Sequence, residues 1–473
     1  MSRSLRRACG LSAVIALGLG ALFAPKFAQA VPSFAAQTGQ PCTQCHVGSF
    51  GPQLTPFGRA FKIGGYTQSG GDGWASQIPL SAMVLQSFTN TSASIPQDQV
   101  TPHYGTNDNY ALDQISVFLA GRVTDNTGGF SQFTYSNIPN ASHLDNTDLR
   151  PYTTTFDLGD TDLRVGMSVN NNPTVQDPYN STPAWGYPFV ASGLAPVPAA
   201  QPILVGAFAT NSIGVTGYGW WDKKLYVEAG GYQTMSSWTL ARTGNAYGPG
   251  ASRGTMPYVR AAYEWNWNEQ SAHIGGIFMQ SNVNPAIADR QSDGSFGHDT
   301  YTDYAVDGSY ELYLDNSKHI VVVQGIYIHE NQSLGGSAGS VNNANANAGS
   351  PTSFGNNYHT DSIRMNASYW YDNTYGVTVG WQGLWGPANP VLYGPGSLTG
   401  SNNSKPSSNA FSIEADWVPF GKEDSWARPF ANLKLGIQYI AYTQFNGGSN
   451  NYDGNGRNAG NNNTLYAFAW LAF

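Results

Sequence analysis

Tyr301-Thr302-Asp303-Tyr304-Ala305-Val306-Asp307-Gly308-Ser309-Tyr310-Glu311-Leu312-Tyr313-Leu314 alternates in polarity along the chain. Apolar and aromatic side chains at positions 304, 306, 310, 312 and 314 share one face of an extended chain, and acids at 303, 307 and 311 share the other. This period of two predicts a β-strand with one apolar and one polar face. The same alternation in residues 409–418 and 429–443 predicts further strands of this kind.

The chain from residue 79 onward divides into sixteen candidate strands, the last at 463–473. Short turns, such as 372–374, alternate with long polar loops, such as 171–203 and 331–357. A soluble β-sandwich is the alternative for such strands, but it does not require this alternation of connections. The pattern therefore predicts an all-β fold, an antiparallel transmembrane β-barrel of about 16 strands.

Two of the candidate strands, the last and the fourth, give further expectations. The last strand places Tyr466, Phe468 and Trp470 on one face, which we expect to point inward. The fourth candidate strand, 148–157, is the weakest, because Pro151 cannot donate a hydrogen bond to a neighbouring strand. After residue 30, no apolar run approaches the ~20 residues of a transmembrane helix.

Residues 1–30 have the features of an export signal. Basic residues precede an apolar stretch from Leu11 to Phe23, and Ala28-Gln29-Ala30 is a small-residue cleavage site. Cleavage there removes four of 22 basic residues and leaves 18 against 30 acids, a charge of −12 for the mature chain. Such an acidic chain is a poor candidate for nucleic-acid binding.

Residues 42–46, Cys42-Thr43-Gln44-Cys45-His46, form the C-x-x-C-H signature of c-type haem attachment. Cys42 and Cys45 would form thioethers to one haem c, and His46 would be an axial ligand of its iron. The alternatives are a redox disulfide of an exported oxidoreductase and part of a zinc site. Neither alternative explains a histidine directly after the second cysteine.

The rest of the segment 31–75 is too short to form an apolar core of its own. Thr55 and Pro56 are suited to begin a helix that ends near Gly64. On this helix Arg59 and Lys62 are candidate contacts of the haem propionates, and the alternative is that both are solvated helix charges. Lys62, Met83, a barrel histidine and water are alternatives for the sixth iron ligand, and the iron could also be five-coordinate.

The N-terminal segment resembles the fused monohaem cytochrome c–porin family of outer-membrane iron oxidases. The resemblance rests on 31–39, the haem motif, 54–62 and 65–67, which read Val31-Pro32-Ser33-Phe34-Ala35-Ala36-Gln37-Thr38-Gly39, Leu54-Thr55-Pro56-Phe57-Gly58-Arg59-Ala60-Phe61-Lys62 and Gly65-Tyr66-Thr67. Where this chain has Ala36, the family pattern has a basic residue. The barrel matches the family in architecture only.

This resemblance implies a signal peptide at 1–30, a monohaem cytochrome c-like domain at 31–75 and a porin-like barrel at 76–473, with the haem segment as a plug or cap. It further implies a Gram-negative outer membrane, with lipid around the barrel and both mature termini in the periplasm. The expected function is electron transfer from extracellular Fe(II), or another donor, to a periplasmic cytochrome or copper protein. The alternative function is a diffusion porin whose haem-bearing segment is a plug or sensor.

The haem assignment predicts the behaviour of two cysteine variants. Cys42→Ala and Cys45→Ala should each abolish or sharply reduce the haem that survives denaturing extraction, because each thiol forms one thioether. Haem staining of denatured protein on a gel measures this. Full covalent haem in both variants would show that these cysteines are not the attachment sites.

Overall fold

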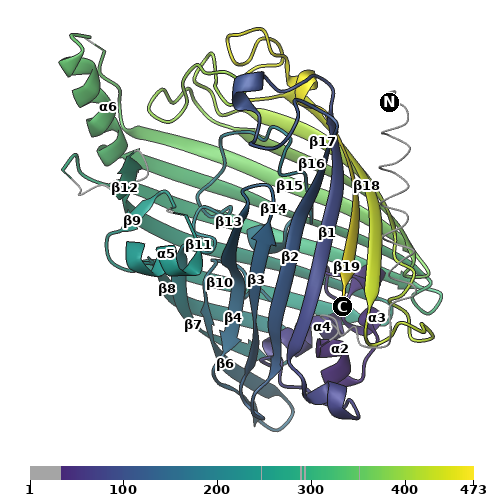
Figure 1. The fold of residues 1–473 in the computed structure, drawn as a ribbon. Coiled ribbons are helices and arrows are strands. Elements are labelled where there is room, and N and C mark those ends of the chain that lie inside the picture. Colours follow the sequence, from purple (N-terminus) through teal and green to yellow (C-terminus); the bar gives the residue numbers. More distant parts are fainter. Residues whose placement is uncertain (1–32, 247, 288–289, 292–294, 351) are drawn as a thin grey trace, which may run out of the picture.

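The computed structural model describes residues 33–473 except 247, 288–289, 292–294 and 351. The predicted export signal, residues 1–30, lies outside the described residues. The described chain begins with a segment of short helices and continues as one antiparallel β-sheet that is rolled into a barrel (Figure 1).

The sheet contains nineteen labelled strands that occupy 16 positions around the barrel. The numbers differ because β4 and β5 share one position, and β9 and β12 are short strands that pair with β11. The bounds are β1 Leu80–Thr91, β2 Asn109–Arg122, β3 Gly128–Ser136, β4 Ala141–Arg150, β5 Thr153–Asp157, β6 Asp162–Asn170, β7 Ser212–Trp221, β8 Leu225–Thr234, β9 Gly250–Ser252, β10 Met256–Trp267, β11 Gln270–Ile287, β12 Arg290–Gln291, β13 Asp299–Leu314, β14 His319–Leu334, β15 Asn357–Tyr371, β16 Tyr375–Trp385, β17 Ser408–Trp417, β18 Asn432–Gln444 and β19 Thr464–Ala472.

The barrel closes between its first and last strands. β1 pairs with β2 on one side and with β19 on the other, so that Met83 lies opposite both Ser116 and Ala472. The predicted fold, an all-β antiparallel barrel of about 16 strands, is confirmed.

Two predicted strand boundaries are wrong. The fourth candidate strand was expected at 148–157, but β4 begins earlier, at Ala141, and the chain breaks at Pro151 before β5. The missing N–H of proline accounts for this break. The long loop predicted at 171–203 implies a sixth candidate strand from 204, whereas β7 begins at Ser212 and the loop continues to residue 211.

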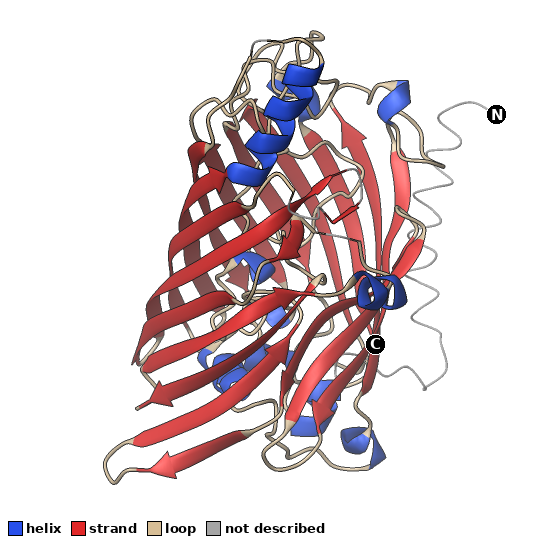
Figure 2. Ribbon diagram, turned by 90° about the vertical axis from the view of Figure 1, so that its left-hand side faces the viewer, coloured by secondary structure: helices blue, strands red, loops and turns tan. Residues whose placement is uncertain are grey.

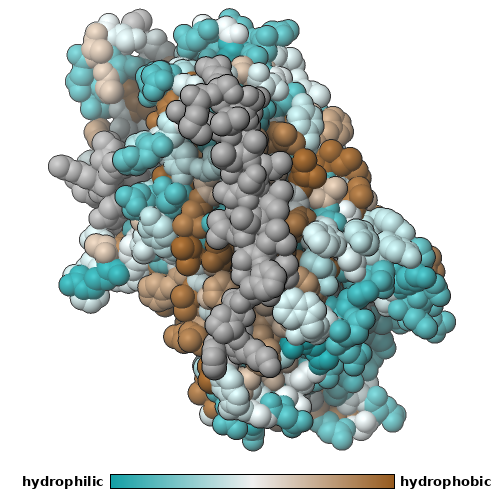
Figure 3. Space-filling model, turned by 45° about the vertical axis from the view of Figure 1, so that its right-hand side comes forward, coloured by the Kyte–Doolittle hydropathy of each residue, from teal (hydrophilic) through white to brown (hydrophobic). Residues whose placement is uncertain are grey.

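The barrel wall is apolar outside and polar inside, as the alternation in 301–314 predicts. On β13, Val306 is 53% exposed on the outer face, whereas Asp303 and Asp307 are 0% and 2% exposed on the inner face. On β19, Tyr466 and Phe468 are buried inside, as expected. Figure 3 shows apolar side chains on the wall between two more hydrophilic ends.

The two ends of the barrel differ in their connections. At what we call the short-turn end, the turns are tight: Asp222 and Lys223 have φ of 50° and 52°, and Asp372 and Asn373 have φ of 52° and 50°. Consecutive positive φ values are typical of type I′ hairpin turns. Exposed aromatic side chains form a belt near this end, as at membrane interfaces; they are Trp221, Trp265, Trp267, Tyr371, Tyr375 and Trp417.

At the opposite end, which we call the long-loop end, the connections are long and carry α6 (Gly335–Asn347), drawn at the top of Figure 2. A second helix, α5 (Ser237–Thr243), lies in the connection that follows β8. A closed antiparallel barrel with an apolar outer face and an aromatic belt is the architecture of outer-membrane proteins, and the protein is such a barrel. Among the described residues, no helix is long and apolar enough to span a membrane.

One connection from the long-loop end folds into the barrel. This segment, residues 171–211, links β6 to β7, and we call it the inward loop. Every residue from 171 to 182 is buried. The loop is fixed to the wall where Asp177 forms an ion pair with Arg260 (3.0 Å) and where the Ser181 hydroxyl donates to Asp307 (2.5 Å). A long polar loop was predicted here, but its position inside the barrel was not.

The N-terminal segment lies inside the short-turn end. It contains α2 (Ser33–Thr38), α3 (Cys42–Cys45) and α4 (Pro56–Ile63), seen beside the C-terminus in Figure 1. Phe61 and Tyr66 share one apolar cluster with Phe118 and Phe130 on the wall. The segment thus uses the barrel wall as the apolar core that it is too short to form alone.

This architecture predicts a topology that can be tested on cells. Hydrophilic tags inserted in loops 331–357 and 387–408 should be labelled on intact cells, while a tag at 372–374 should not, because outer-membrane barrels place short turns in the periplasm. Immunolabelling before and after permeabilisation measures this. Labelling of 372–374 on intact cells, with both long loops silent, would invert the orientation.

Candidate functional site

The two cysteines of the haem motif lie on the single turn of α3. Both thiols are free and half-buried. Burial raises the pKa of Cys42 to about 11 and that of Cys45 to about 12, so both thiols are protonated at neutral pH. The backbone N–H of His46 donates to the Cys42 carbonyl (2.8 Å), which places the imidazole directly after this turn.

The ring of His46 is oriented by a backbone carbonyl. Its Nδ1 lies 3.2 Å from the carbonyl oxygen of Gln53, and a carbonyl can only accept, so Nδ1 carries the proton. Burial lowers the pKa of His46 to about 4, which keeps the ring neutral. The unprotonated Nε2 is therefore available as a metal ligand, the usual arrangement for a histidine whose other nitrogen is held by a hydrogen bond.

The helix α4 begins and ends as its sequence predicts. The Thr55 side chain accepts from the backbone N–H of Gly58 (3.2 Å), Pro56 is the first helical residue, and the helix ends at Ile63 before Gly64. The helix packs closely on α3, since a Cβ at Gly58 would lie 2.2 Å from the Cys45 carbonyl oxygen. The haem motif and α4 are thus parts of one compact segment.

Arg59 is buried in an ion-pair cluster with the barrel wall. It forms salt bridges with Glu264 (2.9 Å) and Glu311 (2.5 Å) and donates to Ser271 (2.7 Å) and to the Leu54 carbonyl (2.9 Å). These bonds use all five N–H donors of the guanidinium. A haem contact for Arg59 stays a prediction, and it would require one of these bonds to be exchanged.

Lys62 is buried between α4 and the inward loop. Its Nζ donates to the Val175 carbonyl and to Asn180 Oδ1, both at 2.8 Å, and lies over the ring of Trp185. Burial lowers its pKa to about 7. The alternative that Arg59 and Lys62 are solvated charges is wrong, since they are 2% and 4% exposed; a haem contact for Lys62 stays a prediction.

The candidates for a sixth iron ligand have protein partners. Lys62 makes the two hydrogen bonds just described, and Met83 Sδ accepts from Trp470 Nε1 at 3.1 Å. His273, a barrel histidine, is held by Ser309 and Asp307. No group of three or more His, Cys, Asp or Glu side chains that could hold a metal ion occurs within the described part of the chain.

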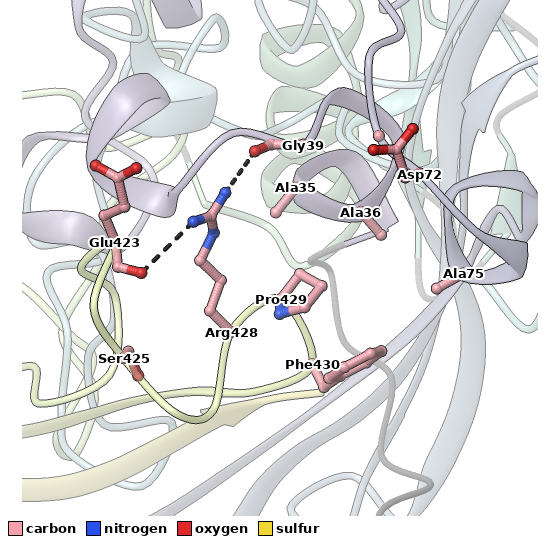
Figure 4. Close-up of a pocket in the computed structure, with 11 residues that line it drawn as sticks. Ala35, Ala36, Gly39, Asp72, Ala75, Glu423, Ser425, Arg428, Pro429 and Phe430 are labelled. Carbon is pink, nitrogen blue, oxygen red and sulfur yellow. Dashed lines mark hydrogen bonds between the residues drawn. The ribbon is translucent and has the colours of Figure 1, made fainter.

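A cleft of about 370 Å³ adjoins the haem-motif segment at the short-turn end (Figure 4). Ala35, Ala36 and Gly39 line one side, and Arg428 lies on the turn between β17 and β18. The Arg428 guanidinium donates to the Gly39 carbonyl and ties this turn to the N-terminal segment.

Sequence reasoning missed several residues that hold this site. The carbonyl of Gln53 carries no sequence signal, and the inward-loop residue Asn180 lies 128 positions from its partner Pro52. Of the two acids that bind Arg59, the sequence does predict the inner-face position of Glu311, because the alternation in 301–314 places it on the polar face. Its partner Arg59 comes from a separate segment, which no local pattern could indicate.

Comparisons with known proteins concern the barrel. No protein-family model matches the chain, and no curated protein matches it either. Solved outer-membrane proteins are similar in fold at low identity. The trimer form of OmpT of Vibrio cholerae is 9% identical over 83% of this chain and 98% of its own, with a TM-score of 0.43. The anion-selective porin from Comamonas acidovorans is 10% identical over 83% of this chain and 98% of its own, with a TM-score of 0.43. The outer membrane channel DcaP of Acinetobacter baumannii is 13% identical over 83% of this chain and 96% of its own, with a TM-score of 0.42.

The ion-pair cluster predicts how the segment is retained. Arg59→Met should lower the free energy of unfolding in detergent by about 3–5 kcal/mol, because Glu264 and Glu311 would stay buried without a cation. Urea denaturation followed by tryptophan fluorescence measures this.

Two control variants accompany this measurement. Arg122→Met removes an arginine that is half-exposed and paired with the exposed Asp125, and it should change stability by less than about 1 kcal/mol. Adding Glu264→Gln and Glu311→Gln to Arg59→Met should restore most of the lost stability. If the triple variant were no more stable than Arg59→Met, unpaired charge would not be the cause.

Proposed function

We propose that the protein is a monohaem outer-membrane conduit that conducts electrons through the barrel, from an extracellular donor, Fe(II), to a periplasmic carrier. The carrier would be a small cytochrome or copper protein. In this proposal the short-turn end and both mature termini face the periplasm, and the long-loop end faces outward.

The observation that carries the proposal is the position of the haem motif. Cys42, Cys45 and His46 belong to a segment enclosed by the wall of a barrel, where Arg59 and Lys62 fix it to the wall and to the inward loop. A membrane is an insulating layer for electrons, and a redox group held inside a protein wall bridges it. The same residues on a soluble domain would not indicate transmembrane transfer.

The residues present fit a covalently attached haem c. Two thiols that form no disulfide lie on one helical turn, and the next residue is a neutral histidine. A carbonyl accepts from its Nδ1–H, so that Nε2 is unprotonated. When bound, this group supplies one-electron exchange between ferrous and ferric iron. The chain would contribute the attachment, the axial ligand and a surrounding with little water.

The interior of the barrel favours a conduit over the alternative, a diffusion porin with a haem-bearing plug or sensor. Inner-face side chains of a water-filled channel are exposed to solvent, but Tyr226, Tyr232, Tyr258 and Arg260 are all 0% exposed. The inward loop meets the N-terminal segment inside the barrel at Asn180. Solute flux would require these packed segments to move, whereas electron transfer requires no open path.

A reconstituted system separates the two functions. Liposomes that contain an oxidised cytochrome would receive the wild-type protein or His46→Ala, and Fe(II) would be added outside. Wild type should reduce the internal cytochrome quickly, and His46→Ala, which removes the fixed iron ligand but no strand contact, should be close to empty vesicles. Absorbance of the internal cytochrome measures the rate, and uptake of a small sugar measures solute flux.

Each outcome of this experiment has one interpretation. Equal reduction rates for wild type, His46→Ala and empty vesicles would contradict an iron conduit. Reduction by a different donor but not by Fe(II) would retain the conduit and remove iron as its donor. Sugar flux without electron transfer would establish the porin alternative.

A further inference from the structure

The inward loop contacts the haem-motif segment beside the residue that orients His46. Asn180 of the loop donates from Nδ2 to the carbonyl oxygen of Pro52 at 2.7 Å. Its Oδ1 accepts from Lys62 Nζ at 2.8 Å. Asn180 is 5% exposed, so water does not compete freely for these bonds. One amide therefore joins two points of the N-terminal segment to the loop.

Pro52 precedes the residue that determines the orientation of the imidazole. The carbonyl of Gln53 accepts from His46 Nδ1 and from the backbone N–H of Val47, both at 3.2 Å. Leu54 pairs with His46 in an isolated β-bridge. The turn 51–54 thus orients the ring through the Gln53 carbonyl, and the carbonyl of the preceding residue, Pro52, is the one that Asn180 binds.

Asn180 is itself held firmly in place. Its backbone φ is 52°, a left-handed conformation that asparagine tolerates better than most residues. Asp177 and Ser181 on either side bind Arg260 and Asp307 of the wall. The amide therefore connects the turn 51–54 to the barrel rather than to a free loop.

We infer that Asn180 is a positioning residue for the iron ligand: by fixing Pro52 it sets the hydrogen bond between His46 Nδ1 and the Gln53 carbonyl, and so tunes the reduction potential of the site. This inference rests on the proposed function, in which His46 binds haem iron. A hydrogen bond from Nδ1–H to a carbonyl makes the imidazole a stronger donor, and a stronger donor favours the ferric state. Loosening the turn should therefore weaken the iron–histidine bond and raise the potential.

The test uses the full-length protein in detergent and compares Asn180→Ala with Asn180→Asp. Neither replacement can donate to the Pro52 carbonyl, but the aspartate still accepts from Lys62. The matched control is Asn172→Ala, which removes another buried asparagine of the same loop whose Nδ2 donates to Asn146 on the wall (2.8 Å). The readouts are covalent haem, the midpoint potential and the iron–histidine stretching band after photolysis of the CO adduct.

Both Asn180 variants should keep covalent haem and lower the frequency of the iron–histidine band, and Asn180→Ala should also have a higher midpoint potential. Asn172→Ala should match wild type in all three. If both Asn180 variants had wild-type haem content and an unchanged iron–histidine frequency, the inference would be overturned and the proposed function would be left intact. Wild-type protein without covalent haem would overturn both.

Discussion

A backbone that crosses lipid must satisfy every N–H and C=O group within the protein, and this constraint shapes the whole molecule. A sheet meets it only when no edge is left open, which here depends on the pairing of β1 with β19. Once the barrel is closed, the part of its outer face that meets lipid must be mainly apolar, so most charged side chains of the strands point inward. In a soluble protein apolar side chains lie inside and charged ones outside; here the outer face is apolar and most charged side chains of the wall lie inside.

Several interior charges are stabilised by pairing, either between segments that are far apart in the chain or between neighbouring strands of the wall. Arg59 lies between Glu264 and Glu311, Arg260 binds Asp177 and Asp307, and Lys434 lies between Glu414 and Asp416. In each cluster one cation faces two acids. Removing one partner of such a buried group is strongly destabilising, since the remaining charge is left without water. The Arg59 and Arg260 clusters thereby hold the N-terminal segment and the inward loop in the barrel more specifically than apolar contact would.

Local sequence was enough to predict the wall of the barrel and the helix α4. The polarity of 301–314 was sufficient because a strand has a period of two, whichever partners it finds. The helix begun by Thr55 and Pro56 was predictable because a cap depends only on neighbouring residues. A weak strand at Pro151 was predictable because proline lacks an N–H. The start of β4 at Ala141 was not, because β4 begins in a stretch of mixed polarity.

What sequence could not reveal are the contacts between distant segments. Lys62 and Asn180 look like ordinary polar residues, and their meeting inside the barrel depends on the inward course of 171–211. The same is true of Arg59, for which solvation was an open alternative until its two glutamates were located. The C-x-x-C-H motif was recognisable because it lies within five consecutive residues, Cys42 to His46, and haem attachment there stays a prediction.

The cluster around Arg59 has a consequence for the barrel on its own. The wall supplies two acids to this cluster, and the N-terminal segment supplies the single cation. A barrel deprived of that segment would therefore have two uncompensated carboxylates, Glu264 and Glu311, on its inner wall. Such unpaired carboxylates would attract small cations and repel anions. The N-terminal segment thus also supplies the positive charge that neutralises these two acids of the wall.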